Sequence, residues 1–380
     1  MSGFLLASYP KPVAAAIERH RDALDADPAS YSLSAEHAAE RAVLGAAARF
    51  LNARAEDIAL IRSTTEGLGL LYSGLAIRAE QEILTTTHDH YATYASLDYS
   101  AKRSGADIKR IALYEDASKA SSEIILSRLR RAITHKTRIL AITWVHSSTG
   151  VKLPVADIAA IVAEANRGRS ESDRLLLCVD GVHGFGVEDI DIQAMGCDFF
   201  IAGTHKWMFG PRGTGILWGA AHAWPNAKPI VPTFDRDAFM QWMGYAPKQG
   251  LNPAIELTPG GTHAFEHRWA MNEAFEFHMN IGKARIQKRI HALNTQLKTE
   301  MEKFAGLRLH TPTDTALSSG ITAFKIDKLD PMHSMRRFRE HNIISTQAPY
   351  NPSYARLAPG LFNTEQEVEH CLATIKKLSS

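Results

Sequence analysis

The chain has 380 residues, 45% of them hydrophobic and 22% charged, which is enough for one large α/β domain and a smaller one. Its formal net charge of +2 marks no surface for a polyanion, so no nucleic-acid partner is expected. The three cysteines, Cys178, Cys197 and Cys371, fit neither a disulfide framework nor a zinc-ligand spacing, which favours a reducing compartment and predicts no metal site.

Membrane and export signals are weak. No apolar stretch reaches the roughly 18 residues that a membrane helix needs, so no membrane partner is expected. Residues 1–8 lack a basic region followed by a long apolar core, which favours a cytoplasmic protein. Because the chain opens straight into the apolar run 4–6, a removed export leader stays open as an alternative.

Helix and strand signals alternate along the first half of the chain. A first helix is expected at 10–27, with Val13, Ile17 and Leu24 at helical spacing. An alanine-rich second helix follows at 35–51. Strands are then expected at 57–63, 82–87, 138–145, 175–180 and 199–203, with helices at 64–75, 94–105 and 154–167. Continuous apolar strands separated by helices predict a mostly parallel sheet covered on both faces.

The pattern changes after Trp218, through a Pro- and Trp-rich stretch. A long helix is predicted over about 266–290, then strands near 320–326 and 354–359, and a final helix from Thr364. We expect the domain boundary near Thr262. A large domain would span 30–262, and a small α+β domain would combine residues 1–29 with 263–380.

Two polar residues follow neighbouring apolar strands. Asp180 ends one predicted strand, and Lys206 follows the next in Gly203-Thr-His-Lys206, ahead of an aromatic and Gly/Pro-rich turn. In open α/β sheets ligands bind at the carboxyl ends of strands, so we expect both side chains at one edge. The alternatives are a surface lysine and a helix N-cap. However, a buried carboxylate is costly without a cationic partner, which favours a functional pair.

The segment 175–219 resembles the cofactor segment of fold-type I pyridoxal-phosphate enzymes, in particular the class V aminotransferase and cysteine desulfurase superfamily. The His-Lys-Trp and Pro-Arg-Gly-Thr-Gly elements resemble most the isopenicillin-N-epimerase-like branch. The resemblance covers about residues 10 to 375 and is specific for the superfamily, not for a substrate. It implies that pyridoxal 5′-phosphate is bound, with Lys206 as its Schiff base and Asp180 keeping its ring nitrogen protonated.

A phosphate site is expected where the strand at 57–63 turns into a helix. The segment 63–67, Ser-Thr-Thr-Glu-Gly, offers hydroxyls and amides at a helix N-terminus, although such residues also cap many helices. It resembles the superfamily's Thr-Thr-Glu-Ala motif, which implies that Thr64 and Thr65 contact the phosphate. By the same resemblance His205 is a further contact on the phosphate side.

Two more histidines are assigned by the resemblance. The superfamily stacks an aromatic residue or a histidine on the cofactor ring, and His90 aligns best, with His88 and Tyr91 as competitors and a solvated loop histidine as the alternative. His183 stands where desulfurases have a glutamine that touches the cofactor's phenolic oxygen. An imidazole can donate the same hydrogen bond.

Residues 260–262, Gly-Gly-Thr, resemble an element that reaches the phosphate from the neighbouring subunit. Gly261 and Thr262 would then complete the site of a two-fold symmetric homodimer, unless they form only an interdomain turn. Arg356 precedes a segment that resembles the superfamily's Asn-Thr-Glu-Glu helix start. It is expected to bind the substrate carboxylate, with Arg212 and Arg268 as alternatives.

The chain departs from the superfamily pattern in two places. Ser147 stands where an asparagine commonly touches the phenolic oxygen or the substrate carboxylate, and its reach is shorter. We keep Ser147 as a substrate contact and expect His146 to fill the space. A persulfide-forming desulfurase needs a thiolate on a mobile loop, but the segment 342–356 has no cysteine, so that reaction is disfavoured.

The leading hypothesis is an aminotransferase, or an enzyme of closely related reaction, acting on an amino acid or amine. The alternatives are an epimerase, whose second acid would be His90, Tyr91 or Tyr94, and a carbon–sulfur lyase that needs no thiol. Aromatic residues at 207, 242 and 350 line the substrate pocket or simply pack. A catalytically idle cofactor-binding homologue is a further class. A nucleotide-binding protein is disfavoured because neither glycine-rich phosphate motif occurs.

Overall fold

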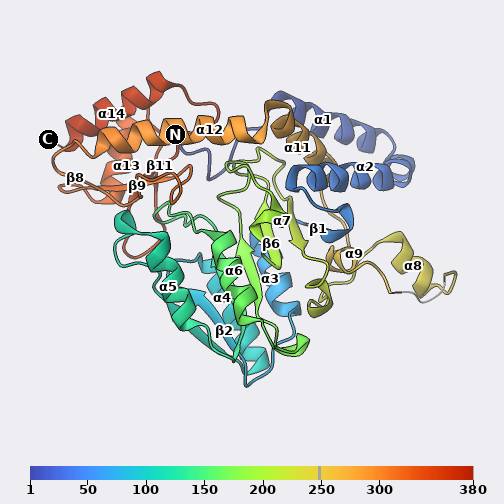
Figure 1. The fold of residues 1–380 in the computed structure, drawn as a ribbon. Helices are drawn as coiled ribbons and strands as arrows, with labels where there is room; N and C mark the ends of the chain where they lie inside the picture. The colour runs from blue at the N-terminus through green and yellow to red at the C-terminus, as the bar shows by residue number, and fades with distance from the viewer. Residues whose placement is uncertain (247–249, 380) are drawn as a thin grey trace.

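The computed structural model of the chain describes residues 1–246 and 250–379. In these ranges a seven-stranded sheet lies at the centre, in the order β1-β7-β6-β5-β4-β2-β3 (Figure 1). Its strands are β1 (Ile58–Ile61), β2 (Glu82–Thr86), β3 (Asp107–Ile111), β4 (Thr137–Thr143), β5 (Leu176–Asp180), β6 (Phe199–Gly203) and β7 (Gly215–Gly219). The pairings from β6 to β3 are parallel, whereas β7 runs antiparallel to β1 and β6. The predicted α/β fold with a mostly parallel sheet is confirmed.

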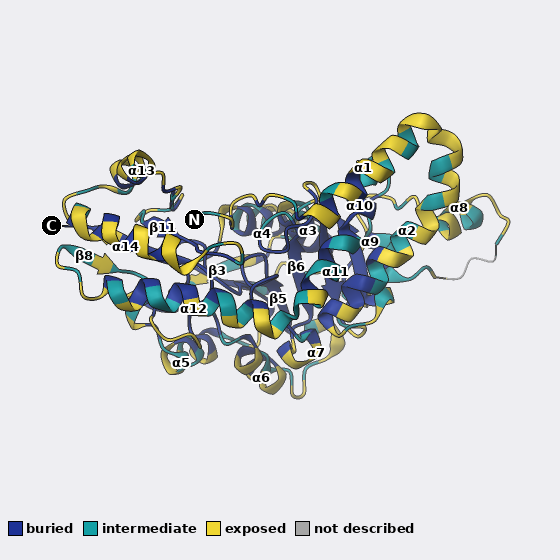
Figure 2. Cartoon of the chain, turned by 90° about the horizontal axis from the view of Figure 1, so that it is seen from above, coloured by how far each residue is buried: buried dark blue, intermediate teal, exposed yellow. Residues whose placement is uncertain are grey.

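Helices cover both faces of this sheet, and Figure 2 shows the strands buried between them. One face carries α5 (Ser122–Ala132), α6 (Val155–Ala165) and α7 (Ile192–Met195), and the other carries α3 (Thr64–Gly74), α4 (Tyr91–Ser104) and α9 (Pro253–Leu257). Alternate residues of a strand point to opposite faces. Leu177 and Val179 therefore pack toward α5 and α6, and Leu176 and Cys178 toward α3 and α4. Asp180 shares this second face.

The prediction of a single continuous helix over about 266–290 is wrong. The structure has three helices there, α10 (Phe265–Trp269), α11 (Met271–Ile281) and α12 (Lys283–Met301). The second break falls at Gly282, whose φ of +97° suits glycine and interrupts the helix. The two N-terminal helices are α1 (Lys11–Ala26) and α2 (Pro28–Leu51). Val13, Ala16 and Ile17 of α1 form one buried cluster with residues of α11 and the turn before it.

A second, antiparallel sheet follows in the order β10-β11-β9-β8. Its strands are β8 (Leu307–Leu309), β9 (Thr322–Ile326), β10 (Thr346–Gln347) and β11 (Ala355–Leu357), accompanied by α13 (Pro331–Glu340) and α14 (Glu365–Ser379). The expected strands near 320–326 and 354–359 and the last helix correspond to β9, β11 and α14. The stretch after Trp218 contains α8 (Arg236–Trp242). The proposed domain boundary near Thr262 stays a prediction.

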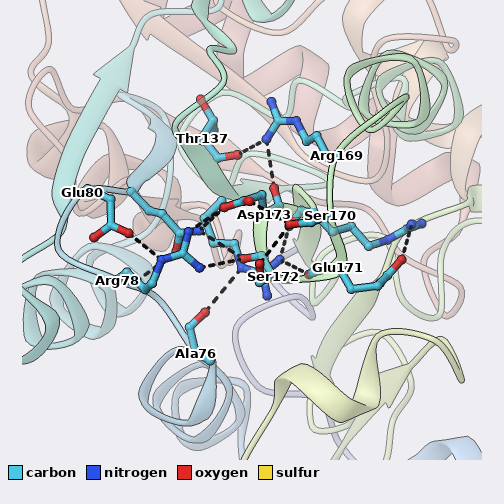
Figure 3. A network of polar contacts seen from close by, with 12 residues as sticks. Ala76, Arg78, Glu80, Thr137, Arg169, Ser170, Glu171, Ser172 and Asp173 are labelled. Atoms are coloured by element: carbon cyan, nitrogen blue, oxygen red, sulfur yellow. Dashed lines mark hydrogen bonds and ion pairs between the residues drawn. The ribbon is translucent and has the colours of Figure 1, made fainter.

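The amino-terminal edge of the large sheet is tied together by arginines. Arg169 Nη1 donates to the carbonyl oxygens of Thr137 (2.7 Å) and Asp173 (3.2 Å), as Figure 3 shows. Arg78 binds the carboxylates of Glu80 and Asp173 in the same network. These arginine N–H groups donate to carbonyl and carboxylate oxygens of the same chain, so we assign this edge a structural role. Over the described ranges no helix has the length and apolar character to cross a membrane.

Candidate active site

A cavity of about 120 Å³ lies at the carboxyl ends of β4, β5 and β6. Its wall consists of Ser63, Thr64, Thr65, Leu68, His90, Ala92, Thr143, Ser147, Asp180, Val182, His183, His205 and Lys206. These residues lie far apart in the sequence, but the ends of parallel strands meet at one sheet edge. All the predicted site residues except Gly261, Thr262 and Arg356 are brought together in this wall.

Lys206 places its amine next to a histidine. Lys206 Nζ lies 3.0 Å from His183 Nε2. Burial, with a smaller contribution from nearby Arg356, lowers the pKa of Lys206 to about 8, while Asp180 opposes the change. A larger fraction of the amine is therefore unprotonated near neutral pH than for an exposed lysine. An unprotonated amine is the form that attacks a carbonyl carbon.

Asp180 is a buried carboxyl group with few partners. Its side chain accepts a hydrogen bond from the Val182 backbone N–H at 3.1 Å, and the residue is 3% exposed. Burial raises the pKa of Asp180 to about 6, although the Val182 bond and Lys206 lower it. Without a ligand the carboxylate is poorly compensated. A protonated ring nitrogen placed beside it would supply the missing positive charge.

Two fully buried polar side-chain atoms in the wall have no hydrogen-bond partner among the described residues. They are His183 Nδ1 and Thr143 Oγ1. Burial lowers the pKa of His183 far below its ordinary value, so its ring is neutral. If Nε2 accepts from Lys206, the assigned tautomer carries its hydrogen on Nδ1 and leaves a buried donor unused. Unsatisfied buried polar atoms cost free energy, and a polar ligand in the cavity removes that cost.

The start of α3 forms the end of the cavity suited to a phosphate. Ser63 Oγ accepts from Glu66 N–H (3.1 Å), and Thr64 Oγ1 accepts from Gly203 N–H (2.8 Å), which ties α3 to β6. Gly67 allows this approach, because a Cβ there would lie 2.4 Å from Ile61 Cδ1. The N-terminus of a helix attracts anions through its free N–H groups and its dipole. The amine, the carboxylate and this anion site together fit pyridoxal phosphate.

His90 is the residue of its segment that faces the cavity. His90 Nδ1 caps α4 by accepting from Ala92 N–H (3.1 Å), so its hydrogen is assigned to Nε2. By contrast, the His88 ring stacks on Tyr114 outside the wall, with centroids 3.9 Å apart. Tyr91 is 73% exposed. The Tyr94 hydroxyl is engaged by Thr86 O and Asp89 N–H. Of the acids considered for epimerisation, only His90 reaches the cavity.

Arg356 lies beside the wall rather than in it. It is 4% exposed and donates to the carbonyl oxygens of Ser147 (2.5 Å) and Gln347 (2.9 Å). The alternatives lie elsewhere: Arg212 is exposed and stacks on Tyr9, and Arg268 pairs with Glu40 at 3.1 Å. The geometry therefore favours Arg356 over both alternatives as the predicted carboxylate ligand.

Several other expectations are settled by position. His146 does not fill the space next to Ser147, so that prediction is wrong: its Nδ1 bonds the Tyr114 hydroxyl at 2.7 Å and it lies outside the wall. Trp207 packs in a buried cluster, and Trp242 is 81% exposed. Gly261 and Thr262 lie outside the wall of their own chain. Their contact with a neighbouring subunit stays a prediction.

Among the residues that the sequence interpretation missed are Thr143 in the wall and Phe4 beside it. Thr143 ends β4 as Asp180 ends β5, so its strand position was an available signal. Phe4 is 1% exposed, with its ring 4.8 Å from the Arg356 guanidinium and 5.8 Å from the His183 ring. The apolar run 4–6 therefore supplies a residue that packs under the site. The three cysteines are buried and absent from the cavity wall.

Comparisons with known proteins agree with this geometry. The family profile described as Aminotransferase class-V matches residues 7–349. A cysteine desulfurase of Yersinia pestis (strain Pestoides F) is 26% identical over 376 residues, covering 92% of this chain and 84% of the relative. A cysteine desulfurase of Yersinia pseudotuberculosis serotype I (strain IP32953) matches to the same extent.

Solved structures show the same fold. The complex of the cystine C–S lyase C-DES with its reaction product cysteine persulfide has a TM-score of 0.86 at 19% identity, covering 100% of this chain and 96% of that one. A C-DES variant with glycine covalently linked to the PLP cofactor has a TM-score of 0.85 at 18% identity, covering 100% and 95%. The chain therefore belongs to the class V aminotransferase family of fold-type I enzymes, whose cofactor is pyridoxal 5′-phosphate.

Proposed function

We propose that this enzyme removes the α-hydrogen of an amino acid and then cleaves a carbon–sulfur bond at the β-carbon, without using a protein thiol. The observation that carries the first half is the Lys206 amine, held at the cavity beside Asp180 and His183 with its pKa lowered to about 8. The relatives named as cysteine desulfurases and a cystine C–S lyase support the second half.

The cofactor, once bound, withdraws electrons from the α-carbon of the amino acid. Lys206 would hold the cofactor's aldehyde carbon until the substrate's amino group takes its place. The released amine would then take the α-proton. Asp180 would hold the proton on the ring nitrogen, and the wall at Thr64, Thr65 and His205 would fix the phosphate. His183 and Thr143, whose buried polar atoms have no partner among the described residues, would bind the remaining oxygen of the cofactor.

The elimination then balances without an oxidant. The electron pair of the α-carbon–hydrogen bond forms the carbon–carbon double bond, and the carbon–sulfur bond breaks with its pair on sulfur. The sulfur product leaves as a thiolate that takes up a proton, and water converts the remaining enamine to a keto acid and ammonia. His90, which faces the cavity with an assigned Nε2–H, is the donor best placed for the leaving sulfur.

No thiol lines the cavity in the part of the chain that the structure describes. Cys178 lies inside β5, where burial raises the pKa of its thiol and disfavours the thiolate. A reaction that passes sulfur to a protein cysteine is therefore poorly supported. Transamination, which the sequence favoured, uses the same Lys206, Asp180 and phosphate contacts. The fate of the proton and of the cofactor distinguishes the two.

The test adds L-cysteine, L-cystine and a panel of other amino acids to the cofactor-loaded enzyme while the absorption spectrum is recorded. Elimination predicts release of a keto acid, ammonia and a sulfur product, with the spectrum returning to its starting form. A cofactor left in its amine form, restored only by added keto acid, would instead establish transamination. Deuterium uptake at the α-carbon with no product would establish epimerisation.

The proposal includes a homodimer, as the family resemblance implies. In that arrangement the loop with Gly261 and Thr262 reaches the phosphate of the neighbouring subunit. Thr262 is exposed and outside its own cavity, so it is free for such a contact. Light scattering of the cofactor-loaded enzyme measures the state directly, and a monomer with full activity would contradict this part.

A further inference from the structure

Tyr350 connects the loop after β10 to the wall of the cavity. Its hydroxyl oxygen lies 2.6 Å from Ser147 Oγ, and its ring meets the His90 ring edge-on at 6.3 Å between centroids. Ser147 and His90 both line the inner cavity. Tyr350 also lines an open hollow of about 560 Å³, formed by residues 347–351. Tyr350 therefore lies between the open hollow and the inner cavity.

Of the two hydroxyl hydrogens of Tyr350 and Ser147, one is not used in the hydrogen bond between them. Each hydroxyl carries a single hydrogen, and only one of the two can lie between Tyr350 and Ser147. Neither hydroxyl has another hydrogen bond within the described part of the chain. Burial raises the pKa of Tyr350 to about 12, so the phenol keeps its proton at neutral pH. The pair is consequently a hydrogen-bond donor at the rim of the cavity.

The donor lies next to a buried cation. Arg356 is 4% exposed and, among the described residues, donates to uncharged partners: Thr346 Oγ1 (3.2 Å) and two backbone carbonyl oxygens. Its guanidinium donates to the backbone carbonyl oxygens of Ser147 and Gln347, so it contacts both segments that the Tyr350–Ser147 hydrogen bond joins. Burial lowers the pKa of Arg356 to about 10 and nearby Tyr350 opposes that change, just as Arg356 opposes the rise in the pKa of Tyr350, because the two groups are close. A buried, unpaired cation beside a spare donor fits an anion.

We infer that the Tyr350–Ser147 pair is a positioning element that donates to the carboxylate of the amino-acid substrate beside Arg356. The inference rests on the proposed function, because the ligand it assigns is the carboxylate of that substrate. It also accounts for the departure at residue 147. A serine has a shorter reach than the asparagine that commonly stands there, and the phenol of Tyr350 extends the hydrogen-bonding group toward the open hollow.

The experiment uses the cofactor-loaded enzyme and two small probes, propionate and propylamine. Tyr350→Phe keeps the ring and removes the hydroxyl, and Tyr354→Phe removes a phenol that stacks on His310 away from the cavity. A hydrogen bond to a charged group predicts that Tyr350→Phe binds propionate roughly tenfold more weakly by calorimetry. Propylamine binding, which involves no carboxylate, stays unchanged, and Tyr354→Phe matches the parent enzyme for both probes.

With an amino-acid substrate, Tyr350→Phe raises KM and leaves kcat within about twofold, since the lost contact is uniform binding. Ser147→Ala weakens propionate in the same direction, which protects the test if the Tyr350 variant folds poorly. Unchanged propionate binding in both variants, or equal loss for propionate and propylamine, would overturn the inference. The binding assay needs no turnover. If the parent enzyme shows no elimination but its Tyr350→Phe variant still binds propionate more weakly, the proposed reaction is contradicted and the carboxylate contact is not.

Discussion

Replacing Asp180 by asparagine should stabilise the cofactor-free chain while it abolishes catalysis. Burial raises the pKa of Asp180 from its ordinary 3.8 to about 6. Since one pKa unit corresponds to about 1.4 kcal/mol, the ionised carboxylate lowers the free energy of unfolding by about 3 kcal/mol at neutral pH. Asparagine has nearly the same shape and carries no charge, so the variant avoids this cost.

The sign of the effect sets a pH window. A carboxyl group whose folded pKa is raised destabilises the fold only when ionised, so the cost is absent below pH 3.8 and complete above about pH 6. The stability difference between Asp180→Asn and the parent should therefore grow from near zero at pH 4 to about 3 kcal/mol at pH 7. Titrating groups that do not interact with Asp180 cancel in this difference, and Lys206, whose pKa of about 8 is raised by Asp180, titrates above this window.

Urea unfolding of both cofactor-free proteins at several pH values measures the difference. Asp198→Asn is a matched control, because Asp198 is 5% exposed but accepts from Leu177 N–H and His222 at 2.7 Å each. That variant should lose stability. In the loaded enzyme, Asp180→Asn should lower kcat by roughly a hundredfold or more, the scale of losing one preorganised electrostatic contact. A pH-independent difference, or loss of stability at pH 7, would refute the assignment of Asp180 as an uncompensated carboxylate.

Three further predictions follow from other parts of the structure. The triple variant Cys178→Ala, Cys197→Ala, Cys371→Ala should keep its turnover, because no thiol lines the cavity; loss of turnover without loss of fold would indicate sulfur transfer through cysteine. Thr64→Val should weaken cofactor binding in equilibrium dialysis. It should also lower the free energy of unfolding by about 1–3 kcal/mol, because it leaves the Gly203 N–H without its acceptor; unchanged affinity for the cofactor would remove Thr64 from the phosphate site. Glu188→Gln should lower the free energy of unfolding by about 3 kcal/mol in urea, because buried Glu188 binds Lys152 and His291 at 2.8 Å each; a neutral effect would show that the ion cluster adds no stability.

Local sequence patterns were sufficient where a strand end fixes the position of the next residue. Asp180 ends β5, Lys206 and Thr64 lie within a few residues after the ends of β6 and β1, and parallel strands align their ends. Apolar runs also gave the order of the central strands along the chain. β3 was missed because Asp107–Ile111 lies at the sheet edge and is not continuously apolar. The strand β10 was missed because it has only two residues, and β8 was missed because none of its three residues is fully buried, unlike those of β11.

Tertiary contacts decided what the sequence left open. Phe4 and Tyr350 come from opposite ends of the chain, and only the folded structure shows that one packs under Arg356 and the other reaches Ser147. The choice among Arg212, Arg268 and Arg356 depended likewise on which of them lies beside the cavity. His146 and Ser147 are adjacent in sequence but point differently, because His146 is held by Tyr114.

The central claim, that Lys206 carries the cofactor, is tested most directly by reducing the yellow, cofactor-loaded enzyme with borohydride and mapping its peptides by mass spectrometry. The account predicts the mass of the reduced cofactor on the peptide that contains Lys206, and an unlabelled, inactive protein for Lys206→Ala. Label on a different lysine of the parent enzyme, or normal turnover by Lys206→Ala, would contradict it.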